Sequence, residues 1–76
     1  MEEFLNFVLR GLAGHPDEVF LTHAAVDGRD VFTVQARQTD LPRLIGKRGQ
    51  TIHAIRSLLT AAGQKHGTKV QLVIPD

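Results

Sequence analysis

The chain has no cysteine, no tryptophan and no tyrosine among its 76 residues. The lack of cysteine excludes disulfide bonds and cysteine-ligated zinc sites, and it is consistent with a reducing cytoplasm, where we expect the protein to reside. The longest apolar runs span only a few residues, far short of the roughly 20 that cross a bilayer, so we expect no membrane partner. The N-terminus is acidic where a secretory signal is basic, so no export signal is expected.

Arrangements of side chains that carry out catalysis are also missing. The four histidines show no metal-ligand spacing, so no metal site is expected. The only serine, Ser57, lies one helical turn after His53, but no third triad member or oxyanion loop accompanies this pair. A nucleotide-binding P-loop fails as well, because Leu41 and Arg48 stand where it needs glycine and Ser or Thr. We therefore predict no enzyme, no cofactor and no small-molecule substrate.

The charges are distributed unevenly along what we expect to be a single domain over residues 1–76. Residues 1–30 carry two cations against six acids, a net charge of −4, whereas residues 31–76 carry seven cations against two acids, a net charge of +5. This asymmetry predicts a polarised surface and an anionic partner for the second half. The alternative is a solvated surface on which the charges segregate without a partner.

Hydropathy periodicity predicts helices and strands in a definite order. The expected elements are an N-terminal helical segment over residues 1–14 with its helix at 3–13, strands over 18–26 and 31–37, a helix–glycine loop–helix unit over 41–66 with its long helix at 50–66, and a strand over 69–74. Asp27-Gly28 predicts an antiparallel hairpin, and the third strand should run parallel to the second if the two are neighbours. We expect an α+β fold in which helices cover one face of a three-stranded mixed sheet.

Two of the predicted helices have distinct apolar and polar sides. The apolar stripe of the first helix comprises Phe4, Leu5, Val8, Leu9 and Leu12. Phe7 lies off this stripe. The long helix has an apolar half, which includes Leu58 and Leu59 and should cover the sheet and a second helix together. Its polar arc comprises His53, Arg56, Ser57, Thr60 and Gln64. Asp40 is expected to cap the short helix.

The nine residues from Leu44 to Ile52 form the most informative motif. Gly46 and Gly49 bracket two cations, Lys47 and Arg48, at the point where a helix begins. Helix N-termini present unpaired N–H groups and partial positive charge, and glycine permits close approach of the backbone. The motif therefore predicts contacts with phosphates. The alternative is a structural helix–helix turn with two solvated cations at its tip.

This motif resembles the core of the KH RNA-binding domain, in which an aliphatic residue, Ile and Gly-x-x-Gly precede a further Ile. The element order is similar to the type II arrangement, α-β-β-α-α-β. The opening helix, the segment His15–Val19 and the run Gly46–Arg56 resemble the small bacterial KH proteins of the KhpA type, and the resemblance covers nearly the whole chain. Gln50 and His53 depart from it, since members often carry cations there, and Pro42 stands where glycine is frequent.

The resemblance implies a groove between the glycine loop with its flanking helices and the central strand, with the variable loop at Gln64 to Thr68. In KH domains this groove holds about four nucleotides of single-stranded nucleic acid. The expected function is low-specificity binding of single-stranded RNA, in an RNA chaperone or in a factor of ribosome assembly or RNA metabolism. The candidate RNA-binding residues are Arg37, Arg43, Ile45, Gly46, Lys47, Arg48, Gly49, Ile52 and Arg56. Arg43 and Arg56 alternatively solvate helix faces, and Ile45 and Ile52 alternatively belong to the core.

The chain is also open to a second interpretation, as a protein-interaction module in which dimerisation is primary and RNA binding secondary. The resemblance suggests a homodimer or a heterodimer with another KH protein. Phe7 and the sheet face opposite the helices are the candidate surfaces. The absence of aromatic residues around the glycine loop argues against an RRM, whose sheet stacks bases on aromatic rings.

Overall fold

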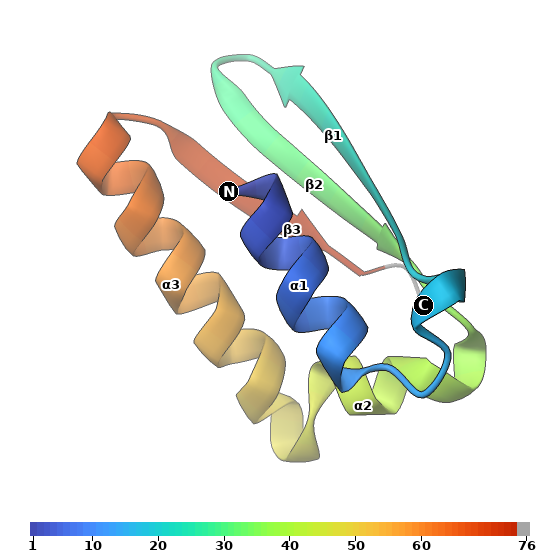
Figure 1. The fold of residues 1–76 in the computed structure, drawn as a ribbon. Coiled ribbons are helices and arrows are strands. Elements are labelled where there is room, and N and C mark those ends of the chain that lie inside the picture. Colours follow the sequence, from blue (N-terminus) through green and yellow to red (C-terminus); the bar gives the residue numbers. More distant parts are fainter. Residues whose placement is uncertain (75–76) are drawn as a thin grey trace.

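Three helices lie on one face of a three-stranded sheet in the computed structural model, which describes residues 1–74 (Figure 1). The helices are α1 (Glu2–Leu12), α2 (Leu41–Ile45) and α3 (Gln50–His66), and the strands are β1 (Phe20–Val26), β2 (Arg29–Gln35) and β3 (Lys69–Val73). Short 3₁₀ turns, at Pro16–Glu18, Gln38–Asp40 and Lys47–Gly49, precede β1, α2 and α3. The predicted α+β architecture of the type II KH-like kind is confirmed.

The sheet is mixed, with strand order β1-β2-β3. β1 and β2 pair antiparallel around Asp27 and Gly28, which both have positive φ, as a two-residue hairpin turn of type I′ requires. β2 and β3 pair parallel, and the connection between them contains α2 and α3. This order places β2 in the centre and leaves β3 as an edge strand. The predicted pairing is therefore correct.

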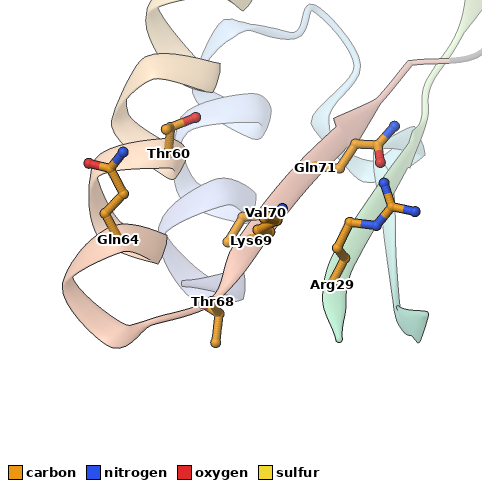
Figure 2. Close-up of a pocket in the computed structure, with 7 residues that line it drawn as sticks. All are labelled: Arg29, Thr60, Gln64, Thr68, Lys69, Val70 and Gln71. Atoms are coloured by element: carbon orange, nitrogen blue, oxygen red, sulfur yellow. The ribbon is translucent and has the colours of Figure 1, made fainter. Parts of the chain in front are cut away.

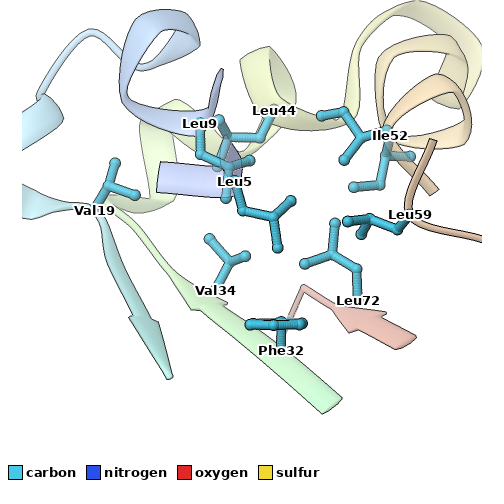
Figure 3. Close-up of a cluster of buried hydrophobic side chains, with 10 residues drawn as sticks. Leu5, Leu9, Val19, Phe32, Val34, Leu44, Ile52, Leu59 and Leu72 are labelled. Atoms are coloured by element: carbon cyan, nitrogen blue, oxygen red, sulfur yellow. The ribbon is translucent and has the colours of Figure 1, made fainter. Parts of the chain in front are cut away.

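The core lies between the sheet and the helices (Figure 3). Phe32 and Val34 of β2 point toward the helices, as their predicted alternation requires. The remaining core residues are Leu5, Leu9, Val19, Leu44, Ile52, Ile55, Leu59 and Leu72. Since α1, α2 and α3 all contribute, one small core fixes every helix relative to the sheet.

The buried strips of the helices are narrower than the predicted apolar stripes. α1 buries Leu5 and Leu9, but Phe4 is 45% exposed. α3 buries Leu59 and contacts both the sheet and α2, as predicted, but Leu58 is 57% exposed, so part of its apolar half is not covered. α1 and α3 share the same narrow sheet, so each needs only a thin strip of apolar residues to cover its part of it. The apolar residues at the margins of the strips therefore face solvent.

Two predicted strand boundaries were also wrong. The first strand begins at Phe20 rather than at residue 18, because Pro16–Glu18 form a 3₁₀ turn in which the fixed φ of proline is favourable. The central strand spans Arg29–Gln35 rather than 31–37, because the hairpin turn occupies only two residues. Arg37 therefore lies beyond the strand.

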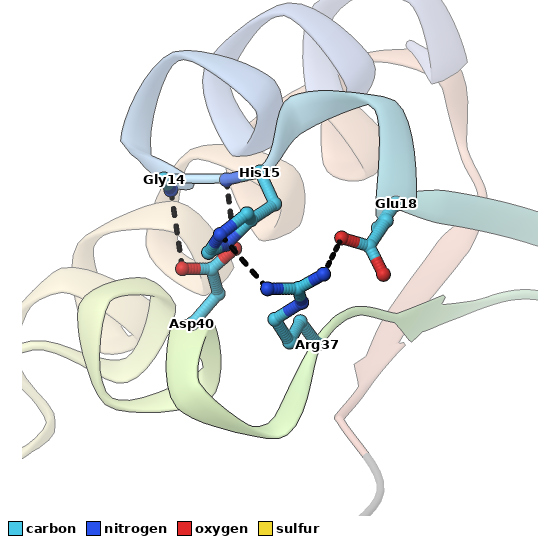
Figure 4. Close-up of polar contacts among 5 residues, drawn as sticks. All are labelled: Gly14, His15, Glu18, Arg37 and Asp40. Carbon is cyan, nitrogen blue, oxygen red and sulfur yellow. Dashed lines mark hydrogen bonds and ion pairs between the residues drawn. The ribbon is translucent and has the colours of Figure 1, made fainter.

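A buried carboxylate joins the loop after α1 to the start of α2 (Figure 4). The side chain of Asp40 is 3% exposed and accepts hydrogen bonds from the backbone N–H groups of Gly14 (3.2 Å) and His15 (2.9 Å). Asp40 occupies the N-cap position of α2, as predicted, but its side chain makes no capping bond to that helix. Its partners are instead about 25 positions away in the sequence, so Asp40 fixes the position of α2 through tertiary contacts.

The His15 ring extends this network. Its Nδ1 lies 3.1 Å from the Asp40 carboxylate, and its Nε2 lies 3.0 Å from Nη1 of Arg37. Because a guanidinium only donates, Nε2 must accept, which places the ring proton on Nδ1. Arg37 also pairs with Glu18, Nη2 to Oε2, at 2.6 Å. The two loops are thus joined by a continuous polar chain.

No helix within residues 1–74 is both long enough and apolar enough to span a membrane.

The Asp40 contacts predict an acid-dependent stability. Burial raises the pKa of Asp40, but the hydrogen bonds from His15 and Gly14 outweigh it, so the pKa lies below its ordinary value of 3.8. A carboxylate with a depressed pKa stabilises the fold above pH 3.8, and this contribution is lost as the pH falls through the native pKa. We therefore expect Asp40→Asn to unfold at a lower temperature than wild type at pH 7 and to converge with it in strong acid.

Thermal unfolding followed by circular dichroism between neutral and strongly acidic pH measures this difference. Asp17→Asn, which changes an exposed carboxylate with no hydrogen bond recorded among residues 1–74, serves as the matched control and should change little. A destabilisation by Asp40→Asn that stayed constant down to the lowest pH would contradict the assignment.

Candidate nucleic-acid interface

Gly46 lets α2 approach the first turn of α3 closely. Its φ of 80° and ψ of 171° fall in a region of backbone conformation that is essentially restricted to glycine. A Cβ at this position would collide with the Thr51 side chain and would lie 2.8 Å from the Thr51 backbone nitrogen. Glycine is therefore required at position 46 for two reasons: the backbone conformation there, and the lack of space for a Cβ beside Thr51.

Arg48 and Gly49 complete a left-handed bend. Gly49 has a φ of 73°, but the nearest atom to a Cβ there would be Ile52 Cγ2 at 4.0 Å, so only its conformation favours glycine. Arg48 has a φ of 56° without being glycine, which costs about 1–2 kcal/mol. Strain of this kind gathers at functional sites. Here it holds an exposed guanidinium at the tip of the loop.

The loop offers unpaired backbone donors beside its cations. Gly46 N–H donates to the Pro42 carbonyl (2.9 Å), and Gly49 N–H donates to the Gly46 carbonyl (3.1 Å). For Lys47 and Arg48, no acceptor of the backbone N–H is recorded within residues 1–74, and both side chains are exposed. These groups precede a seventeen-residue helix, whose N-terminus carries partial positive charge. The arrangement can bind a phosphate.

A polar groove runs along the seam between α3 and β3. A hollow of about 230 Å³ is lined by Arg56, Leu59, Thr60, Val70, Gln71 and Leu72. A second hollow, of about 480 Å³, shares Thr60, Val70 and Gln71 with it and extends to the far end of α3 (Figure 2). These hollows border β3, the strand next to α3, and Arg29 of the central strand β2 also lines the larger one.

The structure places some of the predicted residues at this groove. Arg56 lines it, and its Nη2 donates a 3.1 Å hydrogen bond to the Leu72 carbonyl, which joins α3 to β3. Ile45 is half-buried next to the glycine loop, whereas Ile52 is only 7% exposed and belongs to the core. The Gly46–Gly49 loop and Arg56 thus lie at the same end of α3, two turns apart.

Two predicted cations lie elsewhere. Arg37 is held by Glu18 and His15, away from the central strand that was expected to carry it toward the groove. The Arg43 guanidinium faces the loop after α1, since its Nη1 would lie 3.4 Å from a Cβ built on Gly14. The structure does not bring these two arginines to the glycine loop.

Sequence reasoning missed several residues of the groove. The polar arc of α3 was recognised, but Thr60 and Gln64 were not assigned a role in it. α3 continues through His66, so the predicted variable loop shrinks to Gly67 and Thr68. The groove residues that come from strands are Arg29, Lys69, Val70, Gln71 and Leu72, and their proximity to α3 becomes visible only in the fold. No cluster of three or more residues able to hold a metal occurs in the described part of the chain.

The two glycines of the loop should differ in their tolerance to alanine. Gly46→Ala should lower the free energy of unfolding by about 3 kcal/mol or more, because a glycine-only conformation and a backbone collision combine. Gly49→Ala should cost only about 1–2 kcal/mol, since space is available and only the left-handed conformation is disfavoured. Urea denaturation of both variants measures the difference. Equal losses would contradict the steric role of Gly46.

Comparison with known proteins gives a consistent result. The family model for the KhpA/KhpB KH domain matches residues 2–74. Proteins named RNA-binding protein KhpA from Chlamydia muridarum and Listeria monocytogenes are each 34% identical over 74 residues, which cover 97% of this chain and 95% and 97% of theirs. The protein of the same name from Thermotoga maritima is 36% identical over 61 residues, 80% of this chain and 81% of its own. No solved structure matches the chain. The chain belongs to the KhpA/KhpB family of KH domains.

Proposed function

We propose that this protein binds single-stranded RNA without catalysing a reaction, and that the Gly46–Gly49 loop holds the phosphate backbone. The observation that carries the proposal is the pair of backbone N–H groups, at Lys47 and Arg48, that precede α3 beside two exposed cations. The curated relatives bear the name RNA-binding protein, which supports RNA as the anion. A role as an RNA chaperone, or in ribosome assembly or RNA metabolism, would follow from such binding.

The groove suggests how the nucleotides are held. Phosphates bind the amides of the loop and the side chains of Lys47 and Arg48, and Arg56 adds guanidinium donors, because its bond to the Leu72 carbonyl uses only one N–H of five. Bases lie against the aliphatic surface of half-buried Ile45 and Val70. Few side chains offer base-edge contacts, so specificity is low and affinity falls in the non-specific range of about 10⁻⁴–10⁻⁶ M.

Reversing the charge of the loop should abolish this binding. Lys47→Asp with Arg48→Asp removes both cations and repels phosphate, while the backbone conformation of the exposed tip is retained. We expect the variant to show no RNA binding in fluorescence anisotropy, and its circular dichroism spectrum to be the same as that of wild type. Arg10→Glu with Lys65→Glu produces the same change in net charge on residues that line none of the described hollows. Unaltered RNA affinity in the loop variant, or an equal loss in the control, would refute the placement of the site.

A second function, self-association, is favoured by an apolar hollow on the helical face. This hollow, of about 310 Å³, lies between α1 and α3 and is lined by Met1, Phe4, Leu58, Leu59, Ala62 and His66. Phe4 and Leu58 are both largely exposed within it. Leu58 lies about 160° around α3 from Thr60, at 100° per residue, so the exposed parts of this hollow and of the RNA groove lie on opposite sides of the helix and meet only at buried Leu59. We propose that a second copy of the chain covers the hollow in a two-fold dimer.

Self-association can be tested with one substitution in the hollow and one outside it. Wild type should sediment as a dimer at high micromolar concentration, and Leu58→Glu should sediment as a monomer, because burial of a carboxylate against a second apolar surface is strongly unfavourable. Phe7→Glu changes a side chain that is 73% exposed and does not line the hollow, and it should leave the dimer intact. A monomeric wild type, or dissociation by Phe7→Glu alone, would exclude this interface.

A further inference from the structure

Two cations meet at the end of the groove that is farthest from the glycine loop. Arg29 begins β2, Lys69 begins β3, and the two residues are direct partners in the parallel register. Neighbouring strands lie about 4.8 Å apart, and paired residues point to the same face. The two side chains therefore leave the sheet together, on the face opposite the one that Phe32 and Leu72 present to the helices. Both are exposed, and neither takes part in an ion pair within residues 1–74.

This pairing is unfavourable unless an anion lies beside it. Like charges directly opposite each other on neighbouring strands destabilise a sheet. The nearest acid in the sequence, Asp30, points to the other face and bonds Nε2 of His23 at 2.8 Å. The carbonyls of Gly63 and Gln64, in the last turn of α3, accept N–H groups of the following turn. The two positive charges are therefore not neutralised by the groups around them.

The space beside the two cations is hollowed, and its lining includes polar side chains. The hollow of about 480 Å³ is lined by Arg29 and Lys69 from the strands and by Thr60 and Gln64 from α3 (Figure 2). Hydroxyl and amide groups can donate to phosphate oxygens or to base edges. The hollow is continuous with the groove that leads back toward Arg56 and the glycine loop.

The separation of the two cationic sites matches a single strand of RNA. α3 has seventeen residues, so its length of about 25 Å at 1.5 Å per residue separates the glycine loop from the far end of this hollow, where Lys69 begins β3. At a stacked rise of about 3.4 Å per nucleotide, this distance corresponds to roughly seven nucleotides. A clamp of about four nucleotides at the glycine loop would not reach the second site.

We propose that single-stranded RNA held at the glycine loop continues along the α3–β3 seam, and that Arg29 and Lys69 bind a second backbone phosphate at its far end. The protein then binds about seven or eight nucleotides rather than four. This inference rests on the proposed RNA-binding function, which supplies the first point of attachment.

The dependence of affinity on RNA length tests the second site. Oligouridylates of four and eight nucleotides are titrated against wild type and against Arg29→Gln with Lys69→Gln. The variant should bind the octamer about tenfold more weakly and the tetramer as well as wild type does. Its salt slope for the octamer should fall by about 0.7, because one single-strand phosphate contact is lost. A longer strand gains affinity because it can bind in several registers. Comparing the variant with wild type at the same RNA length cancels this gain.

Two further measurements separate the possible outcomes. Arg10→Gln with Lys65→Gln removes the same net charge away from the hollow and should leave octamer affinity near that of wild type. In ¹H–¹⁵N spectra, the octamer should shift the amides of Arg29 and Lys69, whereas the tetramer should shift only those of the glycine loop. An equal loss for both lengths, or the same loss in the control variant, overturns the second site. If neither oligonucleotide shifts the loop amides of wild type, the proposed function itself fails.

The substitution is expected to leave the protein folded. Replacing two adjacent cations with glutamine removes their repulsion, so the midpoint of thermal unfolding should be equal to or higher than that of wild type. Weaker octamer binding in a variant of undiminished stability identifies the cations as ligand-binding groups rather than structural ones.

Discussion

The close contact between Gly46 and the first turn of α3 is the constraint on which the site depends. With no Cβ at Gly46, the end of α2 passes against Thr51, and the chain can reverse within a few residues. That reversal places Arg48 in a left-handed conformation and leaves the backbone N–H groups of Lys47 and Arg48 without partners in the described residues. A larger residue at position 46 would separate the two helices and remove this arrangement.

α2 is too short to hold the loop by itself. A helix of five residues is not stable in isolation, because the cost of nucleation exceeds what a single turn returns. Leu44 anchors its middle in the core, where it is completely buried. Asp40 fixes its start through Gly14 and His15, and Gly46 fixes its end against α3. The geometry of the glycine loop is therefore determined by residues from three separate segments of the chain.

The sequence was sufficient to predict the order of elements, the mixed sheet and the position of the glycine loop, because these follow from local periodicity and from turn residues such as Asp27-Gly28. The sequence was not sufficient where contacts between distant segments determine the position or exposure of a side chain. The pairing of Arg37 with Glu18 joins two loops, and no local pattern encodes it. The exposure of Leu58 depends on how much of α3 the small sheet covers. The polar arc of α3 was visible in the sequence, but the strand that faces it, β3, was not.

The two faces of α3 give the proposed functions a physical relation to each other. Thr60 and Gln64 line the RNA groove, whereas Leu58 and Ala62 line the apolar hollow on the opposite side. A second copy that covers this hollow would leave the RNA groove of each copy open. The hollow and the groove have only buried Leu59 in common. A single groove of this size binds weakly, but two grooves held in one dimer can bind one RNA with an affinity higher by about 10²–10⁴. Self-association through α3 would thus strengthen RNA binding without any additional contact to RNA.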